Sequence, residues 1–230
     1  MIKLRAWWDL VKEVGEKYGY YVKPSKSYLI LKDSSKLQDA KQLFESSPIN
    51  ISVDGKRHLG AAIGSNEFKC NYVSDLVSDW CKRLRDLTKI AKPQPHVAYA
   101  AFIHKYTYFL RTLDGLSDTL KPLDNILEHE FLPTLFGTTV NAETRMLLEL
   151  PVREGGLGLL KYSTSAPKSF NSSIVQTAPL VDSILSQDGT LPKKEDVKAA
   201  KSEATKLHKT SLITLKTNIL DGSTSEKKFN

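Results

Sequence analysis

The side chains that could catalyse a reaction or hold a metal ion are scattered along this sequence. The two cysteines form no C-x-x-C, the five histidines form no H-x-x-x-H, and no two aspartates are adjacent. Zinc sites and two-metal phosphoryl-transfer sites need such clusters. Gly155-Gly156-Leu157-Gly158 lacks the spacing of a nucleotide-binding loop. The sequence therefore predicts no metal ligand and no catalytic centre that this chain could form by itself.

Basic residues are the stronger functional candidates, because they gather at two places. One group stands just before the small and apolar run Leu59–Gly64, where one backbone can approach another closely. The other lies in the second half of a long predicted helix. Such side chains neutralise nucleic-acid phosphates, although a plain domain corner and a solvated helix face are alternative interpretations. Lys56, Arg57 and His58 stand before that run. The candidates for phosphate contact are Arg57, His58, Lys82, Arg83, Arg85 and Lys89.

The net charge supports a polyanionic partner and is unevenly distributed. The chain carries +7, but residues 1–92 hold 17 Lys and Arg against 11 Asp and Glu, residues 93–190 hold 7 against 10, and residues 191–230 hold 9 against 5. The basic first part points to nucleic acid or an acidic protein. An incidentally basic surface is the other interpretation.

Composition predicts an intracellular protein of the nucleus or cytoplasm with no membrane contact. Hydrophobic residues make up 40% and charged residues 26%, which is ordinary for a globular chain. No apolar run is long enough to span a membrane or to act as a signal peptide. Cys70 and Cys81 are about 16 Å apart on a helix, too far for a disulfide.

The first part of the chain is predicted to be a mixture of helices and strands. Helix Lys3–Tyr18 places apolar residues on one face, including adjacent Trp7 and Trp8, which either pack on a sheet or stack on a ligand. A strand at Ser27–Lys32 and a helix at Lys36–Phe44 follow. Asn50–Ser65 is then expected to be a β-hairpin, with its turn at Asp54-Gly55 and its return strand at Arg57–Ile63.

From Asn66 onward the pattern is helical. A long apolar stripe predicts one helix as far as Ile90 or Ala91. Residues 163–173 are expected to be a loop, and Gly222–Asn230 to be disordered. A polar helix at Glu195–Lys216 either extends into solvent or pairs with a partner. The other expected elements are helices at Val97–Leu113, at Ser117–Leu132 with Pro122 near its start and Pro133 after it, at Glu143–Leu150 and at Ile174–Ser186, with a glycine loop at Arg153–Leu159.

Four segments carry a resemblance to a known family. They are WWDLVKEVGEKYGYYVKPSKSYLILK at residues 7–32, NISVDGKRHLGAAIGS at 50–65, AKPQPHVAYAAFIH at 91–104 and LPVREGGLGLL at 150–160. In this order they resemble the reverse transcriptases of eukaryotic retroelements, of the type found in invertebrate genomes. The region from the first segment to the last spans about two thirds of the chain.

The resemblance implies an α+β fold and a role for particular residues. A small antiparallel palm-like sheet with packed helices, residues 1–65, would precede a helical thumb-like bundle, residues 66–160, and a helical or linker tail, residues 161–230. Lys26 matches a palm lysine that approaches the incoming nucleotide. His58-Leu59-Gly60, with Arg57 before it, resembles the primer grip. Lys82, Arg83, Arg85 and Lys89 would contact phosphates of the template–primer duplex.

Two departures from the family pattern limit the expected activity. In the family, the aromatic-x-Asp-Asp motif that binds two metal ions lies just upstream of the first helix, and this sequence starts after that position. A thumb loop between His104 and Tyr106 is shortened to Lys105. The resemblance thus implies a polymerase fragment that retains at most template–primer binding. It implies Mg²⁺ only for the intact parent enzyme, and the missing polymerase half as a partner. The alternative is a non-catalytic helical module that binds nucleic acid or protein.

Overall fold

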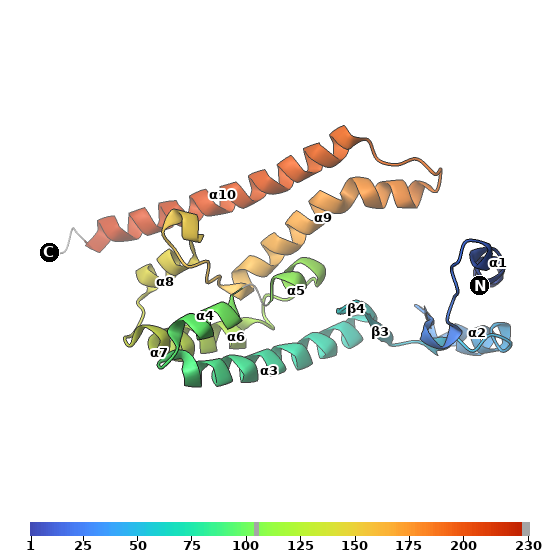
Figure 1. Ribbon diagram of the computed structural model, residues 1–230, viewed down its shortest axis with the longest axis horizontal. Helices are drawn as coiled ribbons and strands as arrows, with labels where there is room; N and C mark the ends of the chain where they lie inside the picture. Colours follow the sequence, from blue (N-terminus) through green and yellow to red (C-terminus); the bar gives the residue numbers. More distant parts are fainter. Residues whose placement is uncertain (104–105, 227–230) are drawn as a thin grey trace. The chain divides into compact units, whose positions relative to one another are not determined.

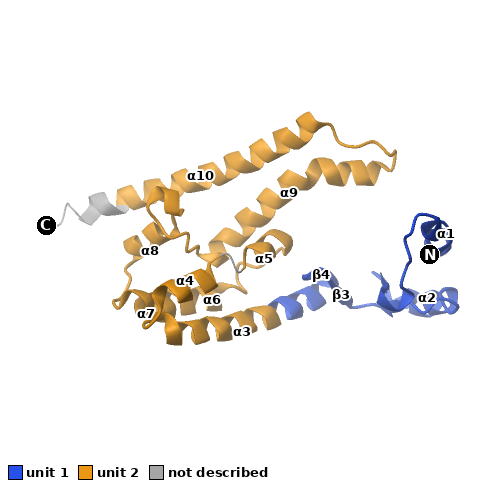
Figure 2. Cartoon of the chain, viewed as in Figure 1, with its two compact units in different colours: residues 1–73 blue, residues 74–230 orange. Residues whose placement is uncertain are grey.

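The computed structural model describes residues 1–103 and 106–226, and it divides the chain into two compact units, residues 1–73 and 74–230 (Figure 2). The boundary falls inside the long helix rather than at residue 65. Residues 161–226 belong to the second unit together with the helices before them. Helices and short strands are both present, so the expected α+β character is confirmed at this coarse level.

The first unit combines short helices with four short strands. Its last element is the beginning of the long helix α3, Asn66–Ala91. The elements before α3 are α1 (Ile2–Lys17), η1 (Pro24–Lys26), β1 (Tyr28–Ile30), η2 (Ser34–Lys36), α2 (Leu37–Leu43), β2 (Asn50–Ser52), β3 (Gly55–His58) and β4 (Ala61–Gly64).

The strands form two separate two-stranded sheets, and only one of them is antiparallel. β1 pairs with β2 in parallel, with Tyr28 opposite Asn50, whereas β3 and β4 are antiparallel. The expectation of a single antiparallel sheet is therefore wrong. The cause is α2, which carries the chain back across the sheet before β2, and such a crossover produces parallel strands.

The β-hairpin is present, but its turn is five residues later than predicted. Leu59 and Gly60 are the two turn residues, with φ of 48° and 84°. Positive φ at both central positions is the type I′ geometry that suits the twist of a hairpin. Gly55, expected in the turn, lies in β3 opposite Gly64. A Cβ on Gly64 would lie 2.3 Å from the Asp54 carbonyl oxygen, so the close backbone approach occurs within the hairpin itself.

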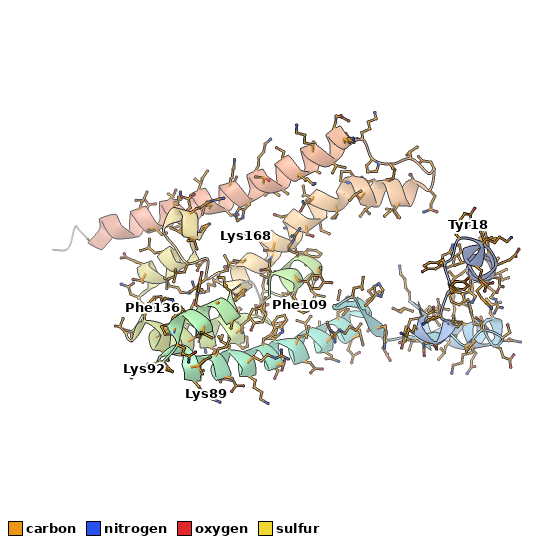
Figure 3. All side chains as sticks on the ribbon, in the orientation of Figure 1. Tyr18, Lys89, Lys92, Phe109, Phe136 and Lys168 are labelled. Atoms are coloured by element: carbon orange, nitrogen blue, oxygen red, sulfur yellow. The ribbon has the colours of Figure 1, made fainter. Side chains whose placement is uncertain are left out.

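The core of the first unit lies between α1 and the segment around α2. Trp8 is buried, and its Nε1–H donates to Ser47 Oγ at 2.7 Å. Arg5 donates to the Leu43 carbonyl at 2.9 Å and lies over the Phe44 ring. The apolar face of α1 is only partly covered, because its partners are short. Trp7 and Tyr18 are exposed, Tyr18 projecting from the end of α1 (Figure 3).

The second unit is helical. The part of α3 that it contains buries Val77, Trp80 and Leu84, so the predicted long helix is confirmed. Trp80 packs against Tyr106 and Phe109, with ring centroids 4.6 and 4.8 Å away. The elements after α3 are α4 (Pro95–Phe102), α5 (Thr107–Thr112), α6 (Lys121–Ile126), η3 (Leu127–Phe131), α7 (Leu132–Phe136), α8 (Ala142–Glu149), η4 (Val152–Glu154), α9 (Tyr162–Ser186) and α10 (Lys194–Glu226).

Two predicted helices differ from the observed ones. The helix expected at Val97–Leu113 is two helices, because α4 ends at Phe102 and Ile103 is extended with ψ of 139°. The shortened loop expected at His104 and Lys105 lies outside the described residues. The helix expected to end before Pro133 instead continues to Phe136. The π-helical turn η3 makes this possible, since Leu132 N–H bonds to Leu127 O and the ladder is already widened where proline enters.

The tail of the chain is a pair of long helices. The loop predicted at residues 163–173 is wrong, because α9 begins at Tyr162 and includes Pro167 and Pro179. It bends in its C-terminal half (Figure 1), as proline in a helix interior causes. α10 runs back along α9, so the polar helix finds its partner within the chain. α10 ends at Glu226, and the disorder predicted for Gly222–Asn230 falls partly on residues 227–230, which lie outside the described residues.

Candidate nucleic-acid interface

Three predicted site residues, Lys26, Arg57 and His58, line one groove of the first unit, with a volume of about 710 Å³. We call it the basic groove. Lys26 ends the short helix η1, which Pro24 begins. The Asn50 side chain donates to the carbonyls of Ser25 and Ser27, at 2.8 and 3.2 Å, and thereby fastens this loop to β2. The parallel β1–β2 pair thus brings Lys26 to the hairpin.

The charge of the basic groove is of one sign. Lys26, Lys56 and Arg57 are among its lining residues, and those residues include no Asp or Glu. None of these three cations lies within 4.0 Å of a carboxylate oxygen of the described residues 1–103 and 106–226. Cations without carboxylate partners attract phosphate groups strongly, because the field is not cancelled locally. The groove is therefore suited to an anionic ligand.

Aromatic and aliphatic side chains complete the basic groove. Leu4 and Trp7 of α1, Tyr28 of β1 and Ile63 of β4 are lining residues and are exposed. The Lys56 ammonium lies 4.3 Å from the centroid of the Tyr28 ring, which is a cation–π contact. Sequence reasoning missed Tyr28, although the alternation of Tyr28 and Ile30 along a short strand places both on one face.

Leu59 and Gly60 have a different place from their predicted neighbours. They form the hairpin turn and are not among the residues that line the basic groove. The Gly60 carbonyl accepts a hydrogen bond of 2.8 Å from the Tyr72 hydroxyl of α3. This bond holds the hairpin turn against the start of α3. Arg57 and His58 line the basic groove, whereas Leu59 and Gly60 do not.

The second predicted cluster lies on the exposed side of α3. Lys82, Arg85 and Lys89 share one face at three- and four-residue spacing, and Arg83 lies beside them. Three of the four cations have carboxylate partners. Arg83 pairs with Asp79 at 2.7 Å, Arg85 with Glu130 at 3.3 Å and Lys89 with Asp86 at 2.7 Å. Lys89 projects from the last turn of α3, and Lys92 follows the end of the helix (Figure 3).

One of these surface pairs affects the ionisation of its carboxyl group. The hydrogen bond from Lys89 holds the pKa of Asp86 below its ordinary value. On the buried side of α3, burial raises the pKa of the Cys81 thiol, so this cysteine stays protonated and unreactive. Arg85 and Cys81 also line a second groove of about 640 Å³ between α3 and α6, which contains Asp118 as well. Because this groove carries both signs of charge, it is the weaker candidate for an anion.

The described residues contain neither a metal-binding cluster nor a helix that could span a membrane. Among residues 1–103 and 106–226, no three His, Cys, Asp or Glu side chains come together as metal ligands. Within the same ranges, no helix combines the length and the apolar character needed to cross a bilayer. No residue of the chain is assigned to metal binding.

Comparison with protein-family models, with curated proteins and with solved structures found no significant match to this chain.

Proposed function

We propose that this chain is a nucleic-acid-binding part of a reverse-transcriptase-like polymerase, with the palm end in residues 1–65 and the thumb in the helices that follow. One observation carries the proposal. Lys26 and the hairpin residues Arg57 and His58 are far apart in the sequence, yet all three line the basic groove. The resemblance relates Lys26 to the incoming nucleotide and the hairpin to the primer end, and a single groove is where such residues would act together.

The chemistry of the basic groove supports binding rather than catalysis. Lys26, Lys56 and Arg57 supply donors for phosphate oxygens, and His58 adds a ring nitrogen. Contacts of this kind position a nucleic acid without reading its sequence. We assign no catalytic step to the chain, since none of its described residues form a carboxylate cluster for the metal ions that polymerisation requires.

A protein-interaction module is the second candidate, and the far end of the α9–α10 pair favours it. Ile184, Leu185 and Leu191 are exposed there by 66%, 73% and 88% of their surface. Neighbouring exposed apolar residues of this kind mark interaction sites. This candidate predicts binding that is insensitive to the cations of the basic groove.

Titration of a labelled RNA–DNA hybrid with a single-stranded overhang tests the proposal. At low salt, the double variant Lys26→Ala/Arg57→Ala should weaken binding by about 10-fold or more, because two phosphate contacts are lost. The matched control is Lys12→Ala/Lys41→Ala, which removes two exposed lysines of the same unit outside the groove. Equal affinity of the two double variants, or no binding by the unaltered chain, would contradict the proposal.

A further inference from the structure

The two adjacent tryptophans of α1 have different environments. Trp8 is buried and hydrogen-bonded to Ser47, so it belongs to the core, and only a small part of it borders the basic groove. Trp7 is 56% exposed and lines the basic groove. An exposed indole next to three cations is not needed for packing. It therefore requires another explanation.

The groove places flat rings and cations in one site. Trp7 and Tyr28 are both exposed and both line it, together with Lys26, Lys56 and Arg57. Lys56 covers one part of the Tyr28 ring at 4.3 Å. Aromatic side chains offer a surface on which any base can stack, and the cations follow the phosphates between bases. Each nucleotide carries one flat base and one phosphate, whereas an acidic peptide carries carboxylates without a ring beside each of them. Rings and cations in one groove therefore match nucleotides better than an acidic peptide.

The form of the nucleic acid follows from the rings. In a duplex the faces of the bases are stacked inside the helix, so an aromatic side chain on a groove wall cannot reach them. Unpaired nucleotides expose those faces. The volume of about 710 Å³ lies within the range of about 300–1,000 Å³ that holds small ligands, so the groove suits a few nucleotides at most.

We infer that the basic groove binds unpaired nucleotides of single-stranded DNA or RNA, with a base stacked on Trp7 and phosphates against Lys26, Lys56 and Arg57. This inference rests on the proposed nucleic-acid-binding function. It goes further in naming the strand form and the stacking residue. Trp7 acts by contact with the ligand, and the cations supply affinity that depends on salt.

The experiment compares two oligonucleotides of about eight units, one of thymidines and one abasic with the same phosphates. Fluorescence anisotropy at low salt should show that Trp7→Leu weakens thymidine binding by about 10-fold or more and leaves abasic binding unchanged. Trp7→Phe should give an intermediate loss, because a smaller ring remains. The matched control is Tyr21→Leu, an exposed aromatic residue of the same unit outside the groove.

Each outcome bears on one of the two proposals. Equal binding of the thymidine and abasic oligonucleotides to the unaltered chain overturns the inference without any variant, so a folding defect in Trp7→Leu cannot obscure the result. Unchanged thymidine binding by a Trp7→Phe or Trp7→Leu protein with unaltered circular dichroism also overturns it. Binding of the hybrid duplex but not of thymidines overturns the stacking site and leaves the proposed function standing. If the unaltered chain binds neither the hybrid duplex nor the thymidines, both proposals are overturned.

Discussion

The hydrogen bond between Trp8 and Ser47 is the most informative single contact of the first unit. Both residues are buried, and Ser47 comes from the turn after α2. A buried donor left without an acceptor costs about 1–3 kcal/mol. The bond therefore holds the indole of Trp8 in a buried position, whereas the neighbouring indole of Trp7 is exposed in the groove.

Replacing Ser47 with Ala should lower the free energy of unfolding by about 1–3 kcal/mol, because Trp8 Nε1–H loses its acceptor in a buried site. Urea unfolding followed by tryptophan fluorescence measures the change. Ser46→Ala is the matched control, since Ser46 Oγ accepts a bond from Arg5 in an exposed position and should change stability by less than about 0.5 kcal/mol. Similar losses in both variants would contradict this account of Trp8.

The sequence identifies the residues of the basic groove but not their assembly. Lys26, Arg57 and His58 are found from residue type and resemblance. That they meet depends on the parallel β1–β2 pair and on Asn50, whose amide fastens the loop of Lys26. Nothing in the local pattern of six strand residues distinguishes parallel from antiparallel pairing. The separation of Trp7 from Trp8 likewise depends on which partner lies opposite each residue, and the helical period alone does not give that.

At the scale of elements, prediction is most accurate where a period is long and uninterrupted. The apolar stripe of α3 predicts its ends within a residue or two. The hairpin turn shows the opposite case. Asp54-Gly55 carries the stronger turn signal, but Leu59-Gly60 forms the turn. Gly55 lies in β3 instead, at a position where the Phe68 ring leaves no room for a side chain. A Cβ on Gly55 would lie 2.5 Å from that ring.

The start of α9 is set by a residue far away in the sequence. Asp124 of α6 is buried, and its two carboxylate oxygens accept the backbone N–H groups of Tyr162 and Ser163 at 2.7 and 2.9 Å. A carboxylate at a helix N-terminus satisfies free donors and interacts favourably with the helix dipole. The local composition of residues 163–173 favours a loop, so the helix depends on tertiary contact. Prediction from local sequence fails here for that reason.

Substitution of Asp124 tests the cap. Asp124→Ala leaves two buried N–H groups without acceptors and should cost about 2–4 kcal/mol, with Asp124→Asn losing about half as much because one oxygen remains. Urea unfolding followed by far-ultraviolet circular dichroism measures both. Asp118→Asn is the control, since its pair with Lys121 is exposed and should contribute less than about 1 kcal/mol. If Asp118→Asn lowered the free energy of unfolding as much as Asp124→Asn does, the effect would come from the lost charge in general and not from the cap.

At the scale of the whole molecule, the candidate cations lie on two surfaces that differ in how many of them are paired with carboxylates. The cations of the basic groove have no carboxylate partners in the described chain, whereas those of α3 mostly have one. Net charge read from the sequence treats the two clusters as equal. The two clusters differ in their ion pairs. A cation of α3 that is paired with a carboxylate must exchange that carboxylate for a phosphate before it can bind nucleic acid. Exposed pairs contribute only about 0–1 kcal/mol, so this exchange costs little.

Charge-neutral removal of whole ion pairs therefore tests the α3 face without changing net charge. The variants Arg83→Ala/Asp79→Asn and Lys89→Ala/Asp86→Asn each remove one cation and its partner. If α3 contacts a duplex backbone, as we propose, each should make the dependence of log K on log salt shallower by about 0.9 for an RNA–DNA hybrid. Lys82→Ala should do the same. A slope equal to that of the unaltered chain in both paired variants would mean that Arg83 and Lys89 pair only with their carboxylates and take no part in nucleic-acid binding.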